Sequence, residues 1–132
     1  MEVVRRPANS RKLKRLASKL QDKAYRDAYV GARARRFLAH QMRTLRGDLS
    51  QAEFGRLIGK PQSVVSRWED PTYGKMTLAS LLDVAARLDR ALVVQFMDWP
   101  AFVTIAEDQD PAPPRPYPDT DLGAASDYAE AG

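Results

Sequence analysis

Four polar residues at helical spacing are the feature of this sequence best suited to binding chemistry: Gln62, Ser63, Ser66 and Arg67. Side chains four positions apart share one face of a helix, so these four line the outer face of one short helix. Their amide, hydroxyl and guanidinium groups donate or accept hydrogen bonds. A helix with such a face has about the width that enters the major groove of B-DNA. The pattern therefore predicts a helix that lies in the major groove of double-stranded DNA.

Groups for catalysis or metal binding are scarce. The chain has no cysteine, and His40 is its one histidine. It therefore has too few ligands for a thiolate or histidine metal site, and too few residues for a histidine-dependent catalytic triad. Glu69 has no second carboxylate placed to work with it, and we expect it to be a structural acceptor near a helix end. We expect His40 to be an ordinary surface residue. The sequence predicts a protein that is not an enzyme and needs no metal and no cofactor.

Charge is distributed unevenly along the chain. Residues 1–46 carry 14 Lys and Arg against 3 Asp and Glu, whereas residues 97–132 carry 1 against 8. A basic front half indicates a polyanionic partner, although solvated helix faces explain the same composition. No apolar run approaches the ~20 residues that span a bilayer, and no apolar block follows the basic N-terminus. With no cysteine, the expected compartment is the cytoplasm.

The patterns divide the chain into three parts. Residues 1–31 are expected to form a basic extension, helical from about residue 10, where leucines recur at helical spacing among lysines and arginines. Gly31 is expected to loosen this helix. Residues 32–96 are expected to form the central domain. Residues 97–132 form an acidic, proline-rich tail that has too little apolar surface to fold and is expected to be disordered.

The central domain contains two short predicted helices joined by a tight turn. Ser50 and Glu53 match a capping box at the start of the first helix. Gly55 stands where the two helices must approach closely, and Gly59 stands where the turn needs a left-handed residue. The apolar residues expected to face inward are Phe54, Ile58 and Val65.

A further helix and one strand are predicted after this pair. Thr77 is expected to cap the helix, whose apolar stripe is expected to be buried: Leu78, Leu81, Leu82, Ala85 and Leu88. Ala91–Phe96 is rich in β-forming residues and predicts one strand. A single strand needs a partner edge for its backbone groups, and we expect that edge to come from a second copy of the chain.

The segments "LSQAEFGRLIGKPQSVVSRWED" and "TLASLLDVAARLD" resemble the Xre/Cro/CI-like family of helix-turn-helix proteins, which have the lambda-repressor-like fold. This resemblance, over about residues 34–96, implies an all-α, five-helix helix-turn-helix domain, here with an extra basic N-terminal helix and one C-terminal β-strand. Two positions depart from the family pattern. Gly55 replaces the usual alanine, which weakens its helix by about 1 kcal/mol, and Lys60-Pro61 replaces a Ser or Thr cap.

The resemblance also implies roles for individual residues. Gln62, Ser63 and Arg67 are expected to contact base edges, since Gln pairs with adenine and Arg with guanine. Gln51 is expected to contact a phosphate and to brace Gln62. The other expected contacts to the DNA backbone are Ser66, Lys75 and Arg43 or Arg46. Tyr73 either contacts DNA or packs the turn, and the Gly74-Lys75 pair that follows it favours contact with the DNA backbone.

These expectations combine into a sequence-specific regulator of transcription, a repressor that binds a pseudo-palindromic site as a homodimer. Two alternatives remain open on the sequence. One is an antitoxin that pairs with a small toxin protein and regulates its own operon. The other is a module whose basic helix binds membrane or RNA, with the helix-turn-helix as scaffold.

Overall fold

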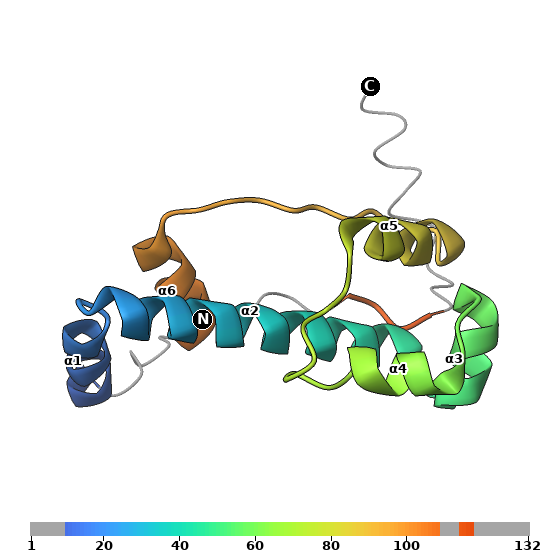
Figure 1. The fold of residues 1–132 in the computed structure, drawn as a ribbon, viewed down its shortest axis with the longest axis horizontal. Helices are drawn as coiled ribbons and strands as arrows, with labels where there is room; N and C mark the ends of the chain where they lie inside the picture. The colour runs from blue at the N-terminus through green and yellow to red at the C-terminus, as the bar shows by residue number, and fades with distance from the viewer. Residues whose placement is uncertain (1–9, 109–113, 118–132) are drawn as a thin grey trace, which may run out of the picture.

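The computed structural model describes residues 10–108 and 114–117, and all regular secondary structure in these residues is helical (Figure 1). The six helices are α1 (Ser10–Lys19), α2 (Lys23–Arg46), α3 (Gln51–Ile58), α4 (Gln62–Trp68), α5 (Leu78–Arg87) and α6 (Trp99–Asp108). The long helix α2 runs along the molecule. Helices α1 and α6 lie at its N-terminal end and α3, α4 and α5 at its C-terminal end. The expected all-α class and the basic N-terminal helix are confirmed.

Helix α2 is continuous where a break was expected. Asp22 caps it by accepting a hydrogen bond from the backbone N–H of Ala24 at 3.0 Å. Its 24 residues, at 1.5 Å of rise each, make a rod of roughly 36 Å. Gly31 lies inside this rod, so the expected boundary between residues 31 and 32 falls within a helix. A glycine costs a helix only about 1 kcal/mol, which the other residues of α2 outweigh.

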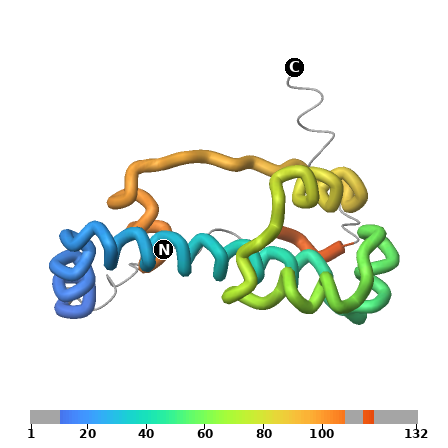
Figure 2. Tube along the Cα trace, in the orientation of Figure 1, coloured from blue at the N-terminus to red at the C-terminus, as the bar shows by residue number. Residues whose placement is uncertain are grey.

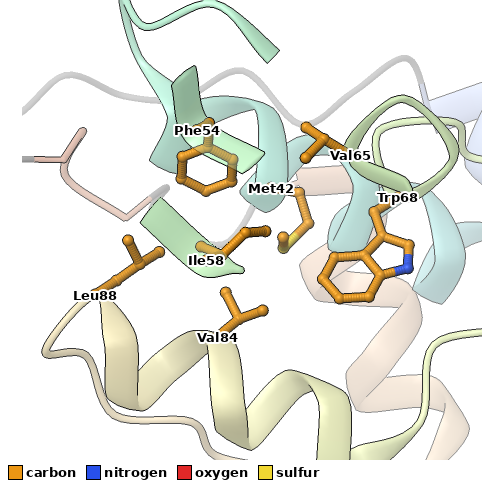
Figure 3. Close-up of a cluster of buried hydrophobic side chains, with 7 residues drawn as sticks. All are labelled: Met42, Phe54, Ile58, Val65, Trp68, Val84 and Leu88. Atoms are coloured by element: carbon orange, nitrogen blue, oxygen red, sulfur yellow. The ribbon is translucent and has the colours of Figure 1, made fainter. Parts of the chain in front are cut away.

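The core lies where α3, α4 and α5 meet α2 (Figure 3). Its buried side chains are Met42, Phe54, Ile58, Val65, Trp68, Val84 and Leu88. The three residues predicted to face inward from the α3–α4 pair are all at most 1% exposed, which confirms that prediction. Each such side chain contributes about 1.5–3 kcal/mol through the removal of apolar surface from water.

The turn between α3 and α4 depends on two glycines. Gly59 has the left-handed φ of +68° that the sequence predicted. At Gly55, an added Cβ would lie 2.4 Å from the backbone oxygen of Lys60. The chain therefore passes too close for alanine at this position, and the lower helix propensity of glycine is the cost of that approach.

Helix caps follow the sequence closely. The Ser50 side chain accepts a hydrogen bond from the N–H of Glu53 at 3.1 Å, and Thr77 accepts one from the N–H of Ser80 at 3.1 Å. Pro61 takes the N-cap position of α4 and makes no side-chain capping bond. Val84 in α5 and the C-cap residue Leu88 enter the core, but Leu78 and Leu82 are 56% and 49% exposed. The predicted stripe is thus buried only in part.

The predicted strand over Ala91–Phe96 is absent from the described chain. This segment runs in an irregular, exposed course from the end of α5 back along α2 to α6 (Figure 2). Val93 is 80% exposed and Phe96 is fully exposed. The physical reason is that a strand needs a second edge to bond its backbone groups, and the described part of this chain supplies none.

Part of the expected tail is ordered. Within residues 97–132, α6 packs on α2, with the rings of Phe37 and Phe102 5.9 Å apart in an edge contact. The Tyr29 hydroxyl donates to Glu107. Farther along, the N–H of Tyr117 donates to the carbonyl of Leu45 at 2.9 Å. The expectations for residues 1–9, 109–113 and 118–132 concern a part of the chain outside the described residues.

Candidate nucleic-acid interface

The exposed face of α4 carries the four polar residues that the sequence singled out. Gln62, Ser63, Ser66 and Arg67 are all exposed, whereas Val65 and Trp68 on the same helix are buried in the core. The burial of these two side chains sets the rotation of α4 about its own axis. The polar face is therefore presented outward by core packing.

A buried carboxylate lies at the end of α4. Glu69 is 5% exposed, and the guanidinium of Arg46 holds it with three hydrogen bonds of 2.9 to 3.0 Å. Arg46 also donates to the carbonyl of Leu49 at 2.8 Å. Two charges taken out of water need such complete pairing. Glu69 thus joins α2, α4 and the start of α3, as expected of a structural acceptor.

Two glutamines extend this network to the outer face. The Gln51 amide nitrogen donates to Glu69 Oε2 at 3.1 Å, and the Gln51 carbonyl oxygen accepts from the Gln62 amide at 2.6 Å. A carboxylate can only accept, so Gln51 must turn its nitrogen toward Glu69 and its oxygen toward Gln62. Gln62 must in turn offer its nitrogen. The orientation of both glutamine side chains is therefore determined by the buried charge.

The residues expected to contact the DNA backbone have different surroundings. Arg43 is an exposed cation, 3.8 Å from Glu69 with 69% of its side chain in solvent. Arg46 is 21% exposed and its guanidinium is engaged by Glu69. Lys75 is exposed in the turn after α4, whereas Tyr73 in the same turn is half-buried and packs against the core. The exposed Ser66 lies between the base-facing candidates on α4.

Asp70 ends α4 with a local turn. Its carboxylate accepts from the N–H of Thr72 at 2.9 Å and from the Thr72 hydroxyl at 2.7 Å. These two bonds hold the pKa of Asp70 below its usual value, because both stabilise the charged form. The two bonds from Thr72 keep the carboxylate occupied.

Sequence reasoning missed how closely Arg35 approaches the turn after α4. An added Cβ on Gly74, whose φ is +58°, would meet the Arg35 side chain at 2.2 Å. Arg35 lies 39 positions before Gly74 in the chain, so no local pattern predicts the contact.

No group of three potential metal-ligating side chains occurs among residues 10–108 and 114–117. Within the same ranges no helix is long and apolar enough to cross a membrane. Comparisons of the chain with protein-family models, curated proteins and solved structures find no match.

Proposed function

We propose that this protein is a sequence-specific double-stranded DNA-binding protein of the Xre/Cro/CI-like helix-turn-helix type and acts as a transcriptional repressor. In this proposal α3 and α4 are the two helices of the motif, and α4 lies in the major groove. The observation that carries it is the chain of hydrogen bonds from Glu69 through Gln51 to Gln62. These hydrogen bonds orient the exposed side chain of Gln62, so that it presents a defined pattern of donors and acceptors.

Gln62 is oriented for pairing with a base before any ligand arrives. One of its two amide hydrogens is engaged by Gln51, which leaves the other hydrogen and the carbonyl oxygen directed away from that bond. A donor and an acceptor side by side match the N7 and N6 positions of adenine in the major groove. Fixing the Gln62 amide in advance lowers the entropy lost on binding. The hydrogen bonds from Glu69 through Gln51 therefore favour sequence-specific contact with a base over non-specific binding to DNA.

Neighbouring residues provide the remaining contacts in this proposal. Arg67 projects from the same exposed face as Gln62 and pairs with guanine, while Ser63 contacts a second base edge. Arg43 and Lys75 neutralise phosphates on either side of the groove. Arg46 acts through Glu69 rather than on DNA, because its guanidinium is already committed to the carboxylate.

A homodimer is part of the proposal, and exposed apolar residues support it. Val93, Val94 and Phe96 are 68 to 100% exposed, and Leu78 and Leu82 on α5 are about half exposed. In two-fold pairing, residues 91–96 of one copy would bond the same segment of the other, supplying the edge that one chain lacks. Light scattering at micromolar concentration should give twice the chain mass of 14.8 kDa. A monomer that also binds no DNA would contradict this part.

Selection of bound sites from a random double-stranded DNA pool tests the proposed function. The proposal predicts enrichment of one motif, arranged as a pseudo-palindrome whose half-sites are one or more helical turns apart. The distance between the two half-sites shows how the two subunits of the dimer are arranged. The sequence of each half-site shows which bases α4 contacts. A pool that remains random after repeated rounds, with binding that salt abolishes equally for all sequences, would overturn sequence-specific recognition.

A further inference from the structure

Helix α1 carries a cationic face that the α3–α4 pair does not use. Lys12, Arg15 and Lys19 follow one another at helical spacing and are exposed. Residues 10–19 contain no acidic side chain. We refer to Lys12, Arg15 and Lys19 as the α1 basic face.

This helix is held in place at its junction with α2. Leu20 is 1% exposed, and its carbonyl accepts a hydrogen bond from Arg26 at 3.0 Å. The guanidinium of Arg26 also lies over the ring of Trp99 in α6, 4.9 Å from its centroid. Lys19 lies 5.9 Å from the ring centroid of Tyr25. These contacts fix the junction between α1 and α2, and the α1 basic face is positioned by that junction.

The junction of α1 with α2 and the contact of α2 with the end of α4 are about one B-DNA repeat apart along α2. Lys23 begins α2 beside α1, and Arg43 lies near the end of α4, 20 residues farther along the same helix. At 1.5 Å per residue this separation is roughly 30 Å, close to the ~34 Å of one DNA turn. In Figure 1, α1 and α4 both project from the same side of α2.

We propose that the α1 basic face is a second DNA-binding surface, which neutralises phosphates about one helical turn from the bases contacted by α4. The inference rests on the proposed function and deepens it. Phosphate contacts carry no sequence information but set register and add affinity. A rigid α2 keeps the two contacts at a defined spacing, so α1 lengthens the footprint of each subunit.

The same helix is poorly suited to a membrane surface. An interfacial helix buries a broad apolar face that includes large side chains among the lipid head groups. In α1 the apolar residues Leu13 and Leu16 are already half-buried and Leu20, which follows the helix, is fully buried. What α1 offers to a partner is charge, which fits a regular polyanion such as duplex DNA.

The test compares two variants of the full chain that lose the same charge. K12Q/R15Q removes two cations from the α1 basic face, and R56Q/R87Q removes two exposed cations from α3 and α5 at the other end of α2. Each protein is bound to the selected site, with flanks of at least two turns on both sides. The readouts are hydroxyl-radical footprints and the slope of log affinity against log salt. Circular dichroism and urea unfolding establish that both variants are folded.

The wild type should protect phosphates about 10 base pairs from the bases contacted by α4. K12Q/R15Q should lose this outer protection, keep the central footprint, and flatten the salt slope by about 1.8 per bound chain, since each neutralised phosphate adds about 0.9. R56Q/R87Q should keep the outer protection.

Other results overturn the inference. One is outer protection that persists in K12Q/R15Q; another is an equal loss of slope in both variants. A third is tight binding of anionic vesicles or single-stranded RNA that depends on Lys12 and Arg15, with no outer footprint on DNA. A central footprint without outer protection in the wild type removes this inference and leaves the proposed function intact. A wild type that selects no DNA motif removes both.

Discussion

The side-chain carbonyl of Gln51 accepts a hydrogen bond from the amide of Gln62 at 2.6 Å, which links the first turn of α3 to the first turn of α4. The buried Glu69 carboxylate determines which way Gln51 faces. An exposed side chain thus takes its orientation from a charge in the interior. Under the proposed function, base recognition by Gln62 and the pairing of the buried Glu69 would be coupled through Gln51.

Removal of Gln51 should loosen Gln62 without unfolding the domain. In Gln51→Ala, Gln62 loses its brace and its amide rotates freely, so we expect weaker preference at one base position by about 1 kcal/mol, the value of one neutral hydrogen bond. Competition between the selected site and a site changed at that position measures this difference. Unchanged discrimination would show that Gln51 does not position Gln62.

Glu69 should matter more for stability than its neighbours on the surface. Glu69→Gln removes the charge that pairs with Arg46 and should lower the free energy of unfolding by about 3 kcal/mol, since breaking a buried pair leaves the other charge uncompensated. Arg43→Ala is the control: its side chain is 69% exposed and 3.8 Å from the same carboxylate, so we expect a loss below about 1 kcal/mol. Urea denaturation measures both. Equal losses would contradict the structural role of Glu69.

Two glycines in helices should respond in opposite directions to alanine. Gly55→Ala should destabilise the protein by about 1–3 kcal/mol, because the new Cβ meets the Lys60 backbone oxygen at 2.4 Å. Gly31→Ala should stabilise it by about 0.5–1 kcal/mol, because the new Cβ meets only the flexible end of Arg35 at 3.2 Å. Thermal unfolding of both variants checks the signs. A stabilising Gly55→Ala would show that the helices can separate at no cost.

Tyr29 should ionise later than an ordinary tyrosine. Burial and the hydrogen bond to Glu107 raise the pKa of Tyr29 to about 12. The folded protein then holds this proton more tightly than the unfolded chain, so the contribution of Tyr29 to stability is complete below pH 10 and is lost as pH rises toward 12. Ultraviolet titration should reveal one late tyrosine that Tyr29→Phe removes. Identical titration curves for the variant and the wild type, scaled for one tyrosine fewer, would contradict the Glu107 contact.

Local patterns predicted much of the fold around α3 and α4. The caps at Ser50 and Thr77, the inward-facing Phe54 and the left-handed Gly59 depend on neighbours within a few residues, and all are confirmed. The brace between Gln51 and Gln62, expected from the family resemblance, is also present. These features share a short range in sequence, which is where periodicity and capping rules apply.

Long-range packing limited the remaining predictions. Helix α6 follows a weak apolar pattern and is ordered through distant residues of α2, such as Phe37, 65 positions before Phe102. Leu78 and Leu82 remain exposed although they fit the helical stripe, whereas Val84 in α5 and its C-cap residue Leu88 are buried in the core. The expected strand has no partner edge within the described chain. The order of α6, the exposure of Leu78 and Leu82 and the absence of the strand all depend on contacts between elements that are distant in the sequence. A pattern of neighbouring residues does not specify such contacts.

The central claim is that α4 contacts bases while the following turn contacts phosphate, and one paired measurement tests it most directly. Affinities of Arg67→Ala and Lys75→Ala are measured on the selected DNA site and on sites changed one position at a time, each over a range of salt. Arg67→Ala should lose about 1–3 kcal/mol and its preference at one position. Lys75→Ala should weaken all sites equally and flatten the salt slope by about 0.9. Arg67→Ala with unchanged affinity and unchanged base preference would contradict the account.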